Sequence, residues 1–159
     1  MDDNGDKIVV KFTPKYNEHA HKLCADNKLV PKLLHIEDVG KWKMVIMEHV
    51  DGITLDKAYN LKQVSCKNIY EDIKSAINLL HEKNYVFADL RPPNIIIIVV
   101  NKDGDQHAML IDFDWTGKHK EDKYPPSINS KLEWPVKEIH GKLLDKSHDY
   151  YWLEKLKIF

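Results

Sequence analysis

The chain has 159 residues, of which 43% are hydrophobic and 31% are charged, and its formal net charge is -1. This length and composition predict one globular domain with its own core and exclude a disordered chain. The nearly neutral charge gives no bulk attraction to nucleic acid or to a membrane surface, so neither is an expected partner.

Three features of the sequence favour a cytoplasmic protein. Cys24 and Cys66 are isolated and form no Cys-x-x-Cys pair, which is typical of a reducing compartment. The acidic residues 1–6 are unlike a signal or transit peptide. The longest apolar run, residues 95–100, is far too short to cross a bilayer.

The first part of the chain predicts a small sheet and one helix. Residues 8–12 are mostly apolar and β-branched and predict a strand, and residues 32–37 and 43–47 predict two more. Thr13-Pro14 is expected to begin a helix, because proline is tolerated in the first turn, and Pro31 is expected to end it. Three apolar residues share one face of this helix at helical spacing: Tyr16, Ala20 and Leu23.

The second part predicts two helices that flank a hairpin. Residues 67–83 carry an apolar stripe with a helical period and predict an amphipathic helix. Residues 95–100 and 108–113 predict two strands joined by a turn at Asp103-Gly104. The following chain is loop-like until a last helix begins near Ser147.

Polar residues stand at the two ends of the predicted hairpin. Asp89, Arg91 and Asn94 precede its first strand, and Asp112 lies near the end of its second strand. The hairpin should return Asp112 to the loop that carries Asn94. A phosphoryl-transfer site needs a carboxylate near the attacking hydroxyl, oxygen ligands for Mg²⁺ and a cation. We therefore expect Asp89 to be the base and Arg91 the cation. Asn94 and Asp112 are the expected metal ligands.

Each of these residues also has a plainer interpretation. Asp89 and Asn94 could be ordinary turn residues beside Pro92-Pro93, and Arg91 could be a solvated loop charge. However, carboxylates brought close together repel each other unless a cation lies between them, which favours a metal site.

At these positions the sequence resembles the protein kinases, and its motif residues are similar to those of kinase-like proteins common in fungi. Residues 89–94 match the catalytic-loop pattern D-L-x-x-x-N. Residues 111–114 match the Asp-Phe-Gly region, with Asp114 in place of the glycine. Residues 9–12 resemble the strand that carries the phosphate-pairing lysine, and residues 44–50 resemble the strand that enters the hinge.

The resemblance extends from Val9 to about Leu156 and implies an α+β, protein-kinase-like fold. It implies a partial N-lobe over about residues 1–47, a hinge at residues 48–52 and a partial, mostly helical C-lobe over residues 53–159. Relative to a complete kinase domain, we expect the chain to be truncated at both ends.

The resemblance also implies which residues contact ATP. These are Lys11, Glu18, Met47, Glu48, Val50 and Ile96. Lys11 would contact the phosphates and form an ion pair with Glu18. Met47 would be the gatekeeper, and the backbone of Glu48 and Val50 would meet the adenine. Lys11 and Glu18 could instead be ordinary solvated charges.

Other parts of the resemblance concern the catalytic loop and the end of the chain. His148-Asp149-Tyr150 resembles the start of the central C-lobe helix, whose aspartate supports the catalytic loop, whereas His81 is expected to be structural. The chain has no Gly-x-Gly-x-x-Gly, and Ala88 stands where kinases often have an arginine. We therefore expect no dependence on phosphorylation between Thr116 and Ser130. An apolar tail, residues 150–159, is expected to stay exposed and promote self-association.

The leading expectation is ATP-dependent phosphoryl transfer to protein Ser/Thr hydroxyls, with ATP and Mg²⁺ as cofactors. A small-molecule kinase of the aminoglycoside or choline type is an alternative, because such enzymes share the fold and often lack the glycine-rich pattern. A non-catalytic pseudokinase or kinase remnant that binds a nucleotide or a partner is a third hypothesis.

Overall fold

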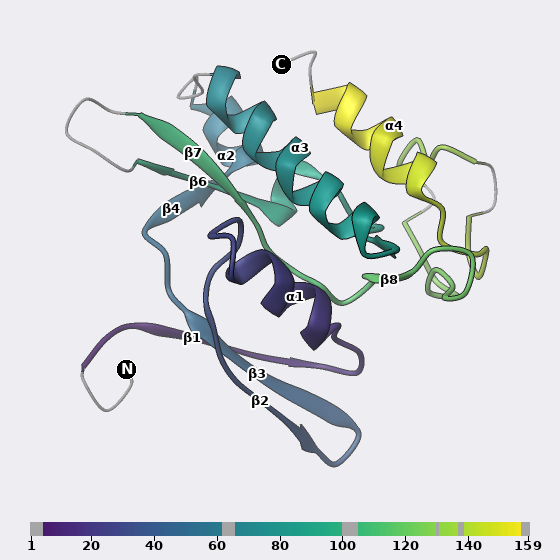
Figure 1. Cartoon of the computed structure of the whole chain (residues 1–159), viewed down its shortest axis with the longest axis horizontal. Coiled ribbons are helices and arrows are strands. Elements are labelled where there is room, and N and C mark those ends of the chain that lie inside the picture. The colour runs from purple at the N-terminus through teal and green to yellow at the C-terminus, as the bar shows by residue number, and fades with distance from the viewer. Residues whose placement is uncertain (1–4, 62–65, 100–104, 130, 137–138, 157–159) are drawn as a thin grey trace.

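The computed structural model describes residues 5–61, 66–99, 105–129, 131–136 and 139–156, and the chain forms two groups of elements (Figure 1). The first group consists of β1 (Ile8–Thr13), α1 (Glu18–Ala25), β2 (Leu33–Val39) and β3 (Trp42–Glu48). The second group begins with β4 (Gly52–Thr54), α2 (Leu55–Asn60), α3 (Cys66–Glu82) and β5 (Tyr85–Val86). It continues with the short 3₁₀ helix η1 (Pro92–Asn94), β6 (Ile95–Val99), β7 (Gln106–Leu110), β8 (Gly117–Lys118) and α4 (Lys146–Leu156).

The N-terminal sheet has the strand order β1-β3-β2, with β3 antiparallel to both neighbours. Alternate side chains of a strand point to opposite faces. Val9, Lys11 and Thr13 therefore share one face of β1, whereas Phe12 is 55% exposed on the other. α1 contacts both β2 and α3, so this helix lies between the sheet and the second group (Figure 1). The three predicted strands are confirmed.

The start of α1 differs from the prediction. The helix begins at Glu18 rather than at Thr13-Pro14, and Tyr16 precedes it. The reason is that Asn17 caps the helix, because its Oδ1 atom accepts a hydrogen bond from Ala20 N at 3.0 Å. An asparagine cap satisfies one of the backbone N–H groups that have no partner within the helix.

Two left-handed residues end elements earlier than the sequence suggests. α1 ends at Ala25, well before Pro31, and the chain then turns through Lys28, whose φ is 58°. β7 ends at Leu110 rather than at residue 113, because Asp112 has a φ of 72° that a strand cannot continue. The predicted turn at 103–104 lies outside the described residues.

The second group is built around a sheet of order β4-β6-β7. Gly52 is required at the start of β4, because a Cβ atom there would lie 2.5 Å from Ile97 O and 2.6 Å from Ile96 Cγ2. α3 packs against β7 and contacts α4, and the two helices run side by side in Figure 1. The predicted long helix and hairpin strands are therefore present, whereas β4, α2, β5 and β8 were not predicted.

The apolar stripe of α3 forms much of the core. Its buried residues are Ile69, Ile73, Ala76, Ile77 and Leu80. No helix in the described part of the chain is both long and apolar enough to span a membrane.

The C-terminal apolar segment is not the exposed tail that the sequence suggested. Trp152, Leu153 and Leu156 are at most 8% exposed and belong to the main core cluster, because α4 packs on α3. Tyr150 is the exposed member, at 46%. Residues 157–159 lie outside the described part. The predicted self-association thus loses the exposed patch on which it rested.

One buried carboxylate joins α4 to the loop before η1. Asp149 is fully buried, and its two oxygens accept hydrogen bonds from Phe87 N at 2.8 Å and Ala88 N at 2.9 Å. The His81 Nε2 atom of α3 lies 2.9 Å from the same carboxylate and donates to it. The expected support of this loop by Asp149 is therefore confirmed, and so is a structural place for His81.

We expect Asp149→Ala to lower the free energy of unfolding by about 3–5 kcal/mol, because two backbone N–H groups and His81 lose their acceptor in the core. Urea denaturation measures the loss. The control is Glu154→Ala on the exposed side of the same helix, which should change the value by less than about 0.5 kcal/mol. Equal losses in the two variants would contradict this role of Asp149.

Candidate active site

The loop before β6 holds Asp89 in one fixed position. Asp89 is 6% exposed, and its carboxylate accepts hydrogen bonds from Arg91 Nε and, at 2.7 Å, from Arg91 Nη2. Asn94 Nδ2 donates to the Asp89 carboxylate at 2.8 Å and to its backbone oxygen at 2.9 Å. The hydrogen bond to Asp89 raises the pKa of Arg91, so the guanidinium remains charged. Three of the predicted site residues are thus brought together.

The hairpin returns Asp112 to Asn94, as the sequence predicts. Ile111 N donates to Asn94 O at 2.9 Å, which places the residue before Asp112 beside the end of η1. The side-chain hydrogen bonds of Asn94 described above use its nitrogen, so its side-chain oxygen is the atom suited to a metal. A carboxylate and an amide oxygen fit Mg²⁺, which is usually held by one or two carboxylates together with substrate phosphates.

Lys11 reaches this part of the site from β1. Its Nζ atom donates to Asp112 Oδ1 at 2.8 Å and to Asp114 Oδ1 at 2.7 Å. Burial raises the pKa of Asp114, and the hydrogen bond from Lys11 opposes this shift. Lys11, predicted to contact phosphates, therefore lies against the predicted metal ligand Asp112.

The structure does not bring Lys11 to Glu18, so the expected ion pair is wrong. Glu18 is the first residue of α1 and accepts a hydrogen bond from Lys22 Nζ at 2.6 Å, one turn along the same helix. The start of α1 at Glu18 places this side chain in the first turn, where the i,i+4 partner lies within reach.

A cleft of about 420 Å³ connects Lys11 to the hinge. The predicted residues that line it are Lys11, Met47, Glu48, Val50, Ile96 and Asp112. It is also lined by Val9, Pro31, His49, Gly52 and Ile111, which were not predicted. Val9 could have been found, because it shares a strand face with Lys11. Much of the lining is apolar, and Lys11 and Asp112 place charged groups at the end away from the hinge.

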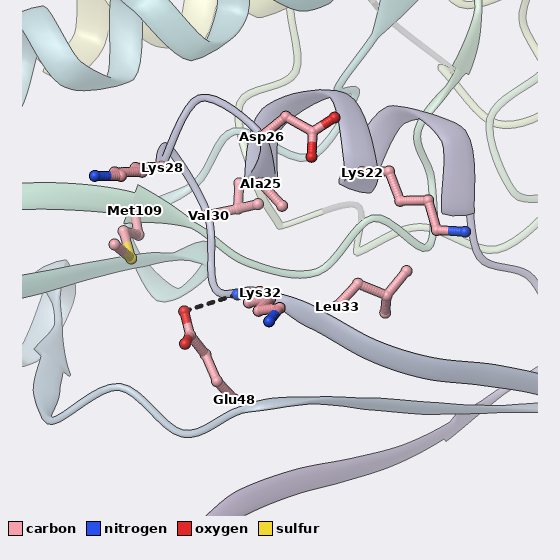
Figure 2. A pocket seen from close by; sticks show the side chains of 9 residues that line it. All are labelled: Lys22, Ala25, Asp26, Lys28, Val30, Lys32, Leu33, Glu48 and Met109. Atoms are coloured by element: carbon pink, nitrogen blue, oxygen red, sulfur yellow. Dashed lines mark hydrogen bonds between the residues drawn. The ribbon is translucent and has the colours of Figure 1, made fainter.

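A second cavity of about 630 Å³ lies where the end of α1, the start of β2 and β7 meet (Figure 2). Lys22, Lys28 and Lys32 line it together with Asp26 and Glu48, so its charges are mixed. In Figure 2 the Glu48 carboxylate points toward Lys32, and it accepts a hydrogen bond from Lys32 N at 2.8 Å. Glu48 N in turn donates to Lys32 O at 3.0 Å, so Lys32 engages both the side chain and the backbone N–H of Glu48.

α1 is tied to the site by a neutral pair of side chains. Burial lowers the pKa of His21, and burial together with the charges of Asp112 and Asp114 raises the pKa of Tyr16. A protonated Tyr16 OH can therefore donate to His21 Nδ1 at 2.5 Å, while His21 Nε2 donates to Pro31 O at 2.7 Å. The His21 ring stacks on Phe113 with centroids 5.0 Å apart.

Aromatic rings pack around Arg91. Its guanidinium lies over Trp115 at 5.8 Å and over Trp134 at 5.9 Å from the ring centroids. Tyr124 packs edge-on against both rings. Such cation–π contacts favour a charged Arg91 in this place and hold the chain after Asp114 against the catalytic loop. Sequence reasoning did not find this cluster, because its members are far apart in the chain.

Two site residues have unusual backbone angles. Ala88 has a φ of 73° and Asp112 a φ of 72°. Non-glycine residues in this region are strained, and such strain persists where surrounding contacts hold it, often at functional sites. The Asp149 bond to Ala88 and the Lys11 bond to Asp112 supply such contacts.

A small sheet with one helix, a hinge beside a cleft, and a larger helical part with Asp89, Asn94 and Asp112 at its edge define a kinase-type phosphotransferase fold. Residues 9–151 match the family of the protein kinase domain. The chain belongs to this family, and its α+β fold is a partial kinase fold.

The chain is similar to several protein kinases. It is 23% identical over 107 residues to serine/threonine-protein kinase D of Synechocystis, covering 67% of this chain and 20% of that protein. It is 36% identical over 81 residues to serine/threonine-protein kinase AtPK1/AtPK6 of Arabidopsis thaliana, covering 50% and 16%. The mouse sperm motility kinase Tcr mutant form is 30% identical over 115 residues, covering 67% and 23%. The matches thus span less than a quarter of the length of each of these relatives.

Two of the three hydroxyl groups described between Thr116 and Asn129 are buried, and Ser130 lies outside the described residues. Thr116 is fully buried and donates to Phe87 O at 3.2 Å, and the Tyr124 hydroxyl lies 3.1 Å from His148 Nδ1 in the interior. Ser127 is exposed. Ala88 has no charge with which to receive a phosphate near this segment.

We therefore expect Ser127→Glu to leave any phosphoryl-transfer rate within about threefold of the parent. The reason is that Ala88 stands where kinases often have the arginine that binds such a negative charge. Ser127→Ala is the matched control, and the rate is measured with radiolabelled ATP. A rate increase of about tenfold or more in Ser127→Glu alone would show that a phosphate at this position is read by the site.

Proposed function

We propose that this chain binds ATP with Mg²⁺ and transfers the γ-phosphoryl group to Ser or Thr hydroxyls of a protein. The observation that carries the proposal is a cleft with Lys11 and Asp112 at one end and the hinge at the other. Asn94 lies beside the residue that precedes Asp112 and holds Asp89 through its side chain. Few side chains are needed for phosphoryl transfer, and they must be placed accurately.

Each residue has a role that follows from its contacts. Asp89 is held by Arg91 and Asn94 and would orient the attacking hydroxyl and accept its proton. Arg91 adds positive charge beside it. Asn94 and Asp112 would hold Mg²⁺, which neutralises charge on the phosphates when it is bound.

The other end of the cleft would hold the nucleotide base. Met47, Val50 and Ile96 supply apolar lining. Glu48 would offer its backbone oxygen to the base, because its backbone N–H already donates to Lys32 O at 3.0 Å. Lys11 would bind the phosphates. Of the six residues expected to contact the nucleotide, Glu18 alone is absent from the lining of this cleft.

A protein hydroxyl is the proposed acceptor because the relatives named above are serine/threonine-protein kinases or a sperm motility kinase. A small-molecule acceptor and a non-catalytic nucleotide-binding role are the competing outcomes. A peptide-library assay and an assay for ATP binding without transfer separate these three cases.

We expect MgATP to stabilise the folded chain, because a ligand that binds only the folded state shifts unfolding by mass action. At ten times the dissociation constant the gain is about 1.4 kcal/mol, or roughly 3–6 °C in Tm for a chain of this size. Differential scanning fluorimetry with MgATP, ATP plus EDTA, and Mg²⁺ alone measures it. No shift at millimolar MgATP in a folded sample would refute nucleotide binding.

Asp89→Asn and Asp112→Asn should separate transfer from binding. Asp89→Asn keeps the shape of the side chain but accepts a proton poorly, so the transfer rate should fall about 100-fold or more while the Kd for MgATP stays similar. Asp112→Asn should instead weaken MgATP and leave metal-free ATP nearly unchanged. Asp89→Asn turnover equal to that of the parent would remove Asp89 from the mechanism.

A further inference from the structure

Asp114 bridges two residues of β1 that face the site. Its Oδ1 atom accepts a hydrogen bond from Lys11 Nζ at 2.7 Å, and its Oδ2 atom accepts one from Thr13 Oγ1 at 2.7 Å. Lys11 and Thr13 are two positions apart on one strand, so their side chains are adjacent on the same face. Thr13 is 2% exposed. The Asp114 carboxylate is therefore held at both oxygens, unlike a mobile surface ion pair.

The placement of α1 does not depend on an ion pair with Lys11. Asn17, the residue that caps α1, donates from its backbone N to Phe113 O and from its side chain Nδ2 to Thr116 O, each at 3.2 Å. The His21 ring stacks on Phe113 within the same helix contact. Glu18 is occupied by Lys22 on its own helix.

Lys11 has a second carboxylate partner, but that partner has another proposed task. Asp112 is the proposed ligand of Mg²⁺, and a carboxylate oxygen that binds a cation attracts a neighbouring lysine less strongly. Asp114 has no such task, and its hydrogen bond from Thr13 holds it beside Lys11. It stands at the position where the kinase pattern has a glycine, which offers no charge.

We infer that Asp114 is a positioning residue that holds Lys11 toward the phosphate end of the cleft, in the role that the kinase pattern gives to a glutamate of the helix. The inference rests on the proposed function for the identity of the ligand. It means that the orientation of Lys11 is set by the same segment that carries Asp112, and that α1 has no direct part in it.

The first test compares ligands with and without phosphates by isothermal titration calorimetry. Asp114→Asn should weaken MgATP about tenfold or more, as expected for loss of one charged hydrogen bond, and should leave adenosine within about twofold. Thr13→Val should weaken MgATP by a smaller factor. Glu18→Gln is the rival variant and should bind both ligands as the parent does. A merely structural role of Asp114 would weaken adenosine and MgATP alike, and that result would overturn the inference.

A double-mutant cycle decides whether Asp114 acts through Lys11. In a Lys11→Met background, Asp114→Asn should weaken MgATP no further, because the partner is already absent. If Asp114→Asn kept its full effect in that background, Asp114 would act on the metal or the phosphates directly and the inference would be wrong.

A last test, by unfolding, needs no nucleotide and so separates the inference from the proposed function. Urea unfolding of the ligand-free protein measures the coupling of Lys11→Met with Asp114→Asn and with Glu18→Gln. We expect clear non-additivity for Asp114 and additivity for Glu18. Coupling to Glu18 and not to Asp114 would overturn the inference whatever the protein binds. Absence of MgATP binding in the parent, with coupling to Asp114 intact, would instead overturn the proposed function alone.

Discussion

The arrangement of the site depends on the buried carboxylate of Asp149. It has no contact with solvent and is balanced by two backbone N–H groups of the catalytic loop and by His81. A buried charge is tolerated only where hydrogen bonds replace its water. The loop is thus fixed at Phe87 and Ala88, immediately before Asp89. Asp89 is the next residue along the chain, so its backbone position is set by this anchor, and Arg91 and Asn94 then hold its carboxylate.

A second set of ion pairs joins the two parts of the molecule. Lys11 on the N-terminal sheet faces Asp112 and Asp114 on the C-terminal part, so one positive charge lies between two carboxylates. The Asp89 carboxylate is balanced separately by Arg91. With two carboxylates against one lysine, this end of the cleft carries an excess of negative charge. The Mg²⁺ of the proposed function would offset this charge.

The sequence predicted those features that depend on local pattern. The stripe of α3, the hairpin strands on either side of residues 103–104 and the return of Asp112 to the loop of Asn94 follow from helical period and hairpin geometry. The start of α1 was misplaced because Pro14 suits a first turn, yet the cap at Asn17 was stronger. The predicted partner of Lys11 was wrong for another reason: Asp112 lies 101 positions away in the sequence, and only the fold brings it to Lys11.

The aromatic cluster beside Arg91 gives the protein an internal optical reporter. Of the four tryptophans in the chain, Trp115, Trp134 and Trp152 belong to or touch this cluster, while Trp42 is half exposed at the far end of the N-terminal sheet. Trp115 and Trp134 have centroids 6.0 Å apart, close enough for their excited states to interact. Intrinsic fluorescence therefore samples mainly the surroundings of the catalytic loop. With Trp42 replaced by phenylalanine, emission would follow that region alone, without any attached dye.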